Sequence, residues 1–449
     1  MSRILVATVP LTGHVQPMLL LVHALVERGH EVTWYAAKKF APAIEKARAR
    51  YVPMSASVDW DDADVETALP VLRRKRGLSR VRAQLRAMFI DPMGQQLRDL
   101  EAIADAIKPD VILADQAHLG AALLHETRGI PWAGLGISAL VIPSIDTAPF
   151  GSALPPARDH RDHPKNRMLN WMIHRVLFGG VTKSYQRARV AAGLAAGTGT
   201  YFDILAPQLF LQPTIPSFEY PRSDLPPQIH FIGPLVPRYP PERAALPAWW
   251  PELEAARAAG VPIVLVTQGT LATDPRELLA PALRGLADAD VLVIATTGRT
   301  LPGPEAMGLR AYPANARVEP FVPYHALLPL TSAIVTNGGY GGVQLALHHG
   351  VPLVVAGGSE EKPEIAARVA WCGAGINLRT GRPSPKKIRA AVARLGAEPQ
   401  FKARVTELAA EMSGYDAAAR GAELVEHLIA TRVPVLRPGA TRALLEAAA

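Results

Sequence analysis

The stretch AIVTNGGYGGVQLALHHGVPLVV, residues 333–355, decides the fold class of this chain of 449 residues. It begins with a short apolar run typical of a buried parallel strand and then passes through a glycine-rich turn. It continues as a helix that ends at a glycine, and a second apolar run follows. Strand, helix and strand in this order form a βαβ unit of a parallel α/β sheet.

The glycine-rich turn of this unit has two interpretations. Gly338, Gly339, Gly341 and Gly342 let a ligand approach the backbone closely, and unpaired N–H groups at a helix start bind anions such as a diphosphate. Alternatively, the glycines form a tight turn needed only for packing. The spacing matches neither GxGxxG nor a phosphate-binding loop that ends in Gly-Lys-Ser/Thr. On the residues alone, both interpretations stay open.

The same rhythm recurs on either side of a proline-rich connector. Apolar runs at 4–9, 31–36 and 111–115 alternate with helical patterns in the first half, and similar runs start at 262 and 290 in the second. Six prolines lie within 233–253, a density that disfavours regular structure. We therefore predict two doubly wound domains with the following boundaries: a first domain over 1–235, a linker over 236–253, a second domain over 254–431 and a tail over 432–449.

The composition excludes several classes of protein. Cys372 is the only cysteine, which excludes a disulfide framework within the chain, and we expect it to be a small buried side chain. The net charge of +8 suits an anionic small ligand, but the basic residues stand in short runs, so nucleic-acid binding is disfavoured. The first apolar run is interrupted at Pro10, and no apolar stretch reaches the length of a membrane span. We expect a cytoplasmic protein.

Two polar residues stand where apolar strands end. His14 lies in VPLTGHVQP, residues 9–17, between a strand and a helical pattern that starts near Met18. It could cap the helix, fill a gap or accept a proton. Asp115 ends the strand VILAD, where it could cap the next helix or orient a catalytic imidazole. His118, three residues on, is expected at the surface or in a pocket wall.

Several motifs, taken in order, resemble one enzyme family. These are TGHVQP (12–17), FEYPRSDLPPQIHFIGPL (218–235), VTQGT (266–270), the glycine-rich turn with FVPYHALLPL (321–330) before it, and GGSEEKPEIAARV (357–369) after it. Together they resemble family 1 of the glycosyltransferases, the UDP-glycosyltransferase superfamily. The resemblance covers nearly the whole chain and is greatest to the actinobacterial branch that decorates macrolides and other natural products. It implies a GT-B fold, in which two Rossmann-like domains face a central cleft.

The resemblance also implies roles for individual residues. His14 matches the base that deprotonates an acceptor hydroxyl, and Asp115 matches its acidic partner. Phe321 matches the residue on which the nucleobase stacks, and Thr270 matches one that contacts the diphosphate. The full set of residues that we expect to bind the donor is Gly13, Thr270, Phe321, Val322, Asn337, Gly338, Gly339, Tyr340, Gly341, Gly342, Glu361 and Lys362.

The chain departs from the family pattern at the residues that contact the phosphates and the sugar. Asn337 stands where most members have a histidine, and its amide donates hydrogen bonds without carrying a charge. Glu361 and Lys362 stand where many members have Asp-Gln, and a lysine accepts no hydrogen bond from a sugar hydroxyl. We expect glucose from UDP-glucose, with a deoxysugar on TDP as the alternative.

Residues 138–180 are proline-rich and then form an amphipathic helical pattern. Met168, Trp171 and Met172 share one side of this helix, and they form either a packed helix face or a wall of the acceptor pocket. The second interpretation predicts a small apolar acceptor such as a polyphenol, a polyketide or a macrolide.

We expect neither a metal nor any cofactor apart from the nucleotide sugar. Asp59-x-Asp61 and Asp62-x-Asp64 resemble the acidic pair of metal-dependent glycosyltransferases, but short acidic runs are typical of solvated loops. His160 and His163 are expected in a mobile loop. The partners expected are the nucleotide sugar and the acceptor, with no membrane insertion and no obligate protein partner. Two alternatives stay open: a GT-B sugar-nucleotide 2-epimerase, and a non-catalytic protein that assists a glycosyltransferase.

Overall fold

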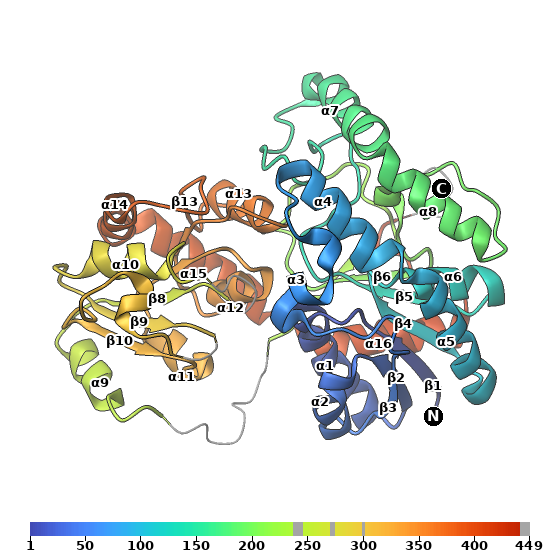
Figure 1. The fold of residues 1–449 in the computed structure, drawn as a ribbon, viewed down its shortest axis with the longest axis horizontal. Coiled ribbons are helices and arrows are strands. Elements are labelled where there is room, and N and C mark those ends of the chain that lie inside the picture. Colours follow the sequence, from blue (N-terminus) through green and yellow to red (C-terminus); the bar gives the residue numbers. More distant parts are fainter. Residues whose placement is uncertain (237–245, 270–273, 299–300, 441–449) are drawn as a thin grey trace.

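The computed structural model describes residues 1–236, 246–269, 274–298 and 301–440. Within these ranges the chain forms two parallel β-sheets, and each sheet lies between helices (Figure 1). This confirms the predicted fold class of two doubly wound α/β domains. Half of the predicted linker 236–253, residues 237–245, lies outside the described residues.

The first sheet has, among the described residues, seven parallel strands in the order β3-β2-β1-β4-β5-β6-β7. The strands are β1 (Arg3–Ala7), β2 (Glu31–Ala36), β3 (Arg50–Pro53), β4 (Val111–Asp115), β5 (Trp132–Leu135), β6 (Leu209–Gln212) and β7 (Ile229–Phe231). The accompanying helices are α1 (Thr12–Glu27), α2 (Ala41–Lys46), α3 (Val65–Ala68), α4 (Gly77–Leu85), α5 (Met93–Ile107), α6 (Leu119–Arg128), α7 (His163–Trp171) and α8 (Gly179–Ala191). Two π-helices, η4 (Arg86–Ile90) and η6 (Met172–Leu177), continue α4 and α7.

The second sheet has six parallel strands within the described ranges, in the order β10-β9-β8-β11-β12-β13. They are β8 (Ile263–Thr267), β9 (Leu292–Thr296), β10 (Ala316–Glu319), β11 (Ala333–Thr336), β12 (Leu353–Val355) and β13 (Gly375–Asn377). The helices of the second half are α9 (Trp250–Ala258), α10 (Leu279–Leu286), α11 (Tyr324–Leu327), α12 (Tyr340–His348), α13 (Lys362–Trp371), α14 (Pro385–Ala397), α15 (Pro399–Ser413) and α16 (Ala417–Thr431).

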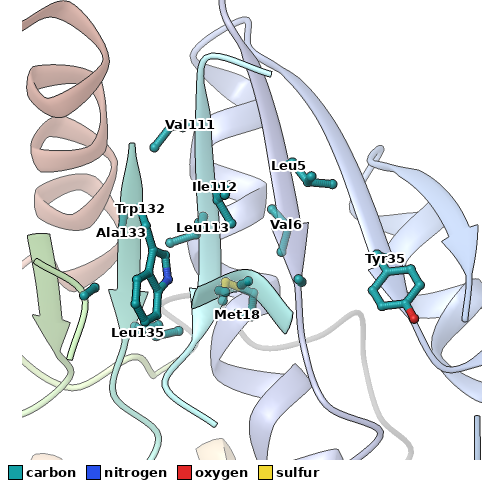
Figure 2. Close-up of a cluster of buried hydrophobic side chains, with 14 of the residues drawn as sticks. Leu5, Val6, Met18, Tyr35, Val111, Ile112, Leu113, Trp132, Ala133 and Leu135 are labelled. Atoms are coloured by element: carbon teal, nitrogen blue, oxygen red, sulfur yellow. The ribbon is translucent and has the colours of Figure 1, made fainter. Parts of the chain in front are cut away.

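Apolar strands explain why both sheets are buried on two faces. Figure 2 shows Leu5 and Val6 of β1 beside Ile112 and Leu113 of β4, with Met18 of α1 packed near them. In the second sheet, successive residues of a strand enter different cores, as Leu265 and Val266 of β8 do. This alternation follows from the strand geometry, which directs neighbouring side chains to opposite faces.

Helix α16 crosses back to the first domain, and this differs from the predicted boundary at 431. Leu424, Val425 and Leu428 of α16 belong to the core of the first sheet. After the helix, the amide of Val435 donates to the carbonyl of Gln208, at 2.8 Å. The last described segment therefore packs with the first domain, because its apolar face completes that core.

Helix α1 begins at Thr12, six residues before the start expected near Met18. Gly13 and Pro17 both disfavour a helix, and they made this segment look like a loop. Tertiary contacts override the local preference, since Val15 and Met18 are fully buried and the carboxylate of Asp62 accepts the amide of Thr12 at 2.6 Å. Gly13 and His14 therefore lie in the first helical turn and not in a loop.

Candidate active site

His14 and Asp115 meet at the carboxyl ends of β1 and β4, which are adjacent strands. Nδ1 of His14 lies 3.1 Å from Oδ1 of Asp115. The contact departs from ideal hydrogen-bond geometry, and Nδ1 has no other hydrogen-bond partner among the described residues. Such contacts often become aligned only when substrate binds. Because Nδ1 faces the carboxylate, Nε2 is the nitrogen left to exchange a proton with a ligand.

Asp115 is fully buried and anchored by backbone amides. The amide of Val9 donates to Oδ2 and the amide of Ala117 donates to Oδ1, each at 2.8 Å. Burial raises the pKa of Asp115, but the nearby His14 side chain, with the hydrogen bond from Val9 among the smaller causes, outweighs burial and holds the pKa below its usual value. The carboxylate is therefore ionised at neutral pH and oriented toward the imidazole.

His118 is buried, which excludes a surface position, one of the two positions expected for it. Its Nδ1 accepts the amide of Ala121 at 3.3 Å, so His118, rather than Asp115, caps α6. Burial lowers the pKa of His118 to about 4, which keeps this ring neutral.

Asp62 contacts the start of α1, and Phe89 contacts the ring of His14. The sequence alone predicted neither contact. Asp62 is buried and binds both the amide and the hydroxyl of Thr12, two residues before His14. This corrects the expectation of a solvated acidic loop at Asp62 only, because Asp61 and Asp64 are exposed. Phe89, on the π-helix η4, stacks on the His14 ring with centroids 6.4 Å apart. Phe89 is directed to His14 by the π-helix over RAMFI, and the hydrophobic periodicity of the sequence does not reveal a π-helix.

The glycine-rich turn joins β11 to α12. Gly338 has a φ of +89°, and a Cβ there would lie 2.7 Å from a methyl carbon of Val355, so this glycine is required by the backbone itself. Gly341 and Gly342 lie in the first turn of α12, and a Cβ on either would meet nothing within 4 Å. Open space therefore borders the positive end of the α12 dipole.

A cavity of about 350 Å³ lies at the carboxyl end of the second sheet. Asn337 and Lys362, two of the predicted donor residues, line it together with Glu277, Ser359 and Arg382. The amide nitrogen of Asn337 donates to the backbone carbonyl of Gln268. Glu277 and Arg382, which pair at 2.9 Å, were not anticipated because they lie far apart in the sequence.

Glu361 and Lys362 form the start of α13, as the N-cap and the first helical residue. Burial and the charge of Glu360 raise the pKa of Glu361, while the charge of His14 acts in the opposite direction. The Lys362 ammonium pairs with Glu360, whose φ of +57° is unusual for a residue with a side chain.

The remaining predicted donor residues are placed differently from one another. The ring of Phe321 is 70% exposed, while Val322 is fully buried. The side chain of Tyr340 points to the first domain, where its hydroxyl accepts a hydrogen bond from Gln212 at 2.9 Å. Only the backbone of Tyr340 is therefore left for a donor. Thr270 lies outside the described residues.

Met168, Trp171 and Met172 lie on one exposed stripe along α7 and η6. Their side chains are 60%, 62% and 43% exposed, so they do not form the packed helix face that was one interpretation. The buried side of the same helix carries Asn166 and Asn170, which hold the preceding loop by hydrogen bonds. The stripe is free to meet a ligand, and its role as an acceptor wall stays a prediction.

Other side chains bear on the metal and cysteine predictions. No group of three or more His, Cys, Asp or Glu side chains that could hold a metal ion occurs among the described residues. His163 pairs with Asp146 at 2.8 Å. Cys372 is buried, as expected, and burial raises the pKa of its thiol to about 11. None of the helices in the described ranges is long and apolar enough to cross a membrane.

Comparisons with known proteins identify the family of the chain. Residues 281–431 match the family model of the erythromycin biosynthesis protein CIII-like C-terminal domain. The chain is 43% identical to 4'-demethylrebeccamycin synthase of Lentzea aerocolonigenes over 95% of this chain and all of that protein. It is 33% identical to UDP-glycosyltransferase 2 of Phaeomoniella chlamydospora, over 95% of this chain and 96% of the relative.

Solved structures share the fold. The calicheamicin glycosyltransferase CalG4 superposes with a TM-score of 0.73, at 22% identity, over 97% of this chain and all of that one. The glycosyltransferase VinC, solved in complex with DTDP, gives 0.63 at 24% identity, over 96% of this chain and all of VinC. The chain is therefore a glycosyltransferase of GT-B fold, and it belongs to the actinobacterial natural-product branch of the UDP-glycosyltransferase superfamily.

Proposed function

We propose that this enzyme transfers a sugar, with inversion, from a nucleoside diphosphate to a hydroxyl group of a small apolar natural product. The His14–Asp115 pair carries the proposal, since a general base beside a buried carboxylate at the end of a sheet is what such a transfer needs. The relatives named as glycosyltransferases weigh against an epimerase and against a non-catalytic helper.

His14 acts as the base in the proposed reaction. Nε2 accepts the proton of the acceptor hydroxyl while the oxygen forms a bond to the anomeric carbon of the sugar. On the opposite face, the bond between that carbon and the diphosphate breaks, and the diphosphate leaves with the bonding electrons. Asp115 stabilises the imidazolium that results, because it stays ionised beside Nδ1.

The start of α12 receives the leaving diphosphate. Gly341 and Gly342 carry backbone N–H groups of the first helical turn, a Cβ on either would meet nothing within 4 Å, and the helix dipole favours the negative charge. Asn337 and Lys362 line the adjoining cavity. Phe321 offers an exposed ring on which a nucleobase stacks.

The donor that we favour is UDP-glucose. Several relatives, among them UDP-glucosyltransferase 1 of Beauveria bassiana at 33% identity, are named for this nucleotide and sugar. A TDP-sugar is the competing donor, because VinC was solved with DTDP. Glu361 is the residue proposed to accept hydrogen bonds from the sugar hydroxyls, and Lys362 limits how many such bonds the pair accepts.

The acceptor that we favour is small and mostly apolar, such as a polyphenol, a polyketide or a macrolide. The exposed stripe of Met168, Trp171 and Met172 supports an apolar acceptor wall. The 43% identical relative is named for the synthesis of 4'-demethylrebeccamycin, which supports a natural-product acceptor. The cytoplasmic location stays a prediction of the sequence.

The test combines a donor panel with a base variant. UDP, TDP, UDP-glucose and TDP-glucose are titrated into the protein by calorimetry, and transfer to a set of polyphenols and macrolides is followed by mass spectrometry. We expect UDP and UDP-glucose to bind, and His14→Ala to bind them equally but to transfer sugar at least about a hundredfold more slowly. Transfer that is unchanged in His14→Ala would contradict the proposed base.

A further inference from the structure

A strap of irregular backbone, residues 140–153, leads from the first domain to the second. It follows β5, and its first half is held by first-domain carboxylates. The amide of Leu140 donates to Oε1 of Glu219 at 2.9 Å, and the amide of Ile145 donates to Oδ2 of Asp224 at 2.8 Å. Near its far end, Phe150 packs against a hydrophobic cluster that joins Ile215 and Phe218 of the first domain to the core of the second.

The far end of the strap is bound by a single carboxylate of the second domain. Oε1 of Glu364 accepts the amides of Gly151 and Ala153, at 2.8 and 2.6 Å. Glu364 lies on α13 and is 3% exposed. Hydrogen bonds from backbone amides to a buried charge are among the strongest in proteins, so this contact fixes the strap on α13.

A buried arginine holds Glu364 in place. Nη1 of Arg368 donates to Oε2 of Glu364 at 2.9 Å, and Nε donates to Oε2 of Glu219 at 3.0 Å. The guanidinium group of Arg368 also lies over the ring of Tyr220, 4.2 Å from the ring centre. Glu219, Arg368 and Glu364 therefore form one buried chain of charges between the two points that hold the strap.

The docked strap has a backbone that is unfavourable in isolation. Ala153 has a φ of +53° and Gly151 has a φ of +95°. The left-handed region is costly for alanine, and such residues persist where surrounding contacts determine the conformation. The two amides that bind Glu364 belong to these two residues, so the strap depends on this carboxylate to keep its conformation.

Glu364 lies one helical turn after Glu361, so the two residues are neighbours on the surface of α13. Glu361 is the residue proposed to contact the donor sugar. We propose that Glu364 is a positioning residue that couples the donor-sugar end of α13 to the strap of the first domain, so that donor binding stabilises the strap. The coupling rests on the proposed donor site, whereas the clamp itself rests on the contacts above.

Hydrogen exchange of the full chain, measured by mass spectrometry on peptides that cover 147–155, tests both parts. The variants are Glu364→Gln, which removes the charge, and Glu364→Asp, which keeps a charge near Arg368 but withdraws the oxygens from the strap. Glu407→Gln on α15 is the matched control, because Glu407 also pairs with an arginine within one helix but lies at the surface. Each protein is measured with and without saturating UDP-glucose.

We expect exchange in the strap to be about tenfold faster or more in both Glu364 variants, and unchanged in Glu407→Gln. UDP-glucose should slow strap exchange in the wild type but not in the variants, although the variants still bind UDP. Equal strap exchange in wild type and folded variants would overturn the clamp. Equal protection by UDP-glucose in all of them, or none in the wild type, would overturn the coupling. A wild type that transfers no sugar contradicts the proposed function and leaves the clamp measurement valid.

Discussion

Nδ1 of His14 lies 3.1 Å from Oδ1 of Asp115, although the two residues are about a hundred positions apart in the chain. The contact forms because β1 and β4 are adjacent parallel strands, so the segments that follow them meet at the same edge of the sheet. Asp62 then fixes the start of α1 from a third segment. The position of His14 relative to Asp115 therefore follows from the strand order of the first sheet, and the contacts that set it all come from the first domain.

His14→Ala should lower kcat by about 10²- to 10⁴-fold, because the proton of the acceptor then has no base within reach. Asp115→Asn should also lower kcat, since a neutral amide no longer stabilises the imidazolium. Both are measured as initial rates with saturating UDP-glucose, alongside UDP affinity, which should not change. His118→Asn is the matched control: it removes a buried histidine next to Asp115 but keeps a side chain that caps α6. A control variant as slow as Asp115→Asn would count against the dyad.

Gly342→Ala should separate stability from nucleotide binding. A Cβ at this position meets nothing within 4 Å, and alanine favours a helix over glycine by about 0.5–1 kcal/mol. We expect a free energy of unfolding equal to or above that of the wild type, together with weaker UDP binding, because the methyl group enters the space proposed for the diphosphate. Thermal unfolding and calorimetric titration with UDP measure the two effects.

Gly338→Ala provides the contrast within the same turn. Its φ of +89° and the 2.7 Å approach to Val355 predict a loss of stability before any ligand is added. Unchanged UDP affinity in Gly342→Ala would show that the open space beside α12 does not hold the diphosphate.

Phe321→Ala should weaken nucleotide binding and leave the fold intact. The ring is largely exposed, so its removal costs little stability, whereas stacking of a base on an aromatic ring contributes about 1–3 kcal/mol. We expect the Kd for UDP to rise about tenfold or more, and Phe321→Trp to restore binding. Calorimetry with UDP and TDP measures this, and an equal Kd in Phe321→Ala would exclude the stacking role.

Local pattern predicted the strands, the two α/β domains and the polar residues at the strand ends, because apolar runs and glycine stops are encoded within a few residues. It failed where distant segments decide the outcome. The amphipathic face of α16 is compatible with either sheet, and only tertiary packing selects the first. Likewise, Gly13 and Pro17 read as helix breakers, while a carboxylate from Asp62 and the buried Val15 hold the helix.

The same limit applies to the candidate site. Tyr340 lies in the glycine-rich motif, yet its hydroxyl accepts a hydrogen bond from Gln212 of the first domain. The spacing of residues within the motif does not predict this contact. Glu277 and Arg382 line the cavity from elements about a hundred residues apart. A resemblance to a family predicts residues that the family shares, and these two contacts belong to the packing of this chain.

Glu426 of α16 should make the stability of the first domain depend on pH in the acidic range. Its carboxylate binds Arg28 at 2.7 Å and His30 at 2.9 Å, at the end of α1. The hydrogen bond from Arg28 outweighs burial and lowers the pKa of Glu426 from 4.5 to about 2. The unfolded chain therefore takes up a proton at a higher pH than the folded one. The stabilisation is complete above about pH 4.5 and is lost as the pH falls toward about 2.

Glu426→Gln should accordingly lower Tm by about 1–3 °C near pH 7, and the difference from the wild type should shrink as the pH is lowered to about 3. Glu423→Gln on the same helix is the control, because Glu423 and Arg420 form a pair in which both side chains are about half exposed, and it should shift Tm less at every pH. Thermal unfolding followed by circular dichroism measures both series. A Glu426→Gln difference that stays constant from pH 7 to pH 3 would mean that the charge of Glu426 does not join α16 to α1, and that apolar packing alone holds the last helix on the first domain.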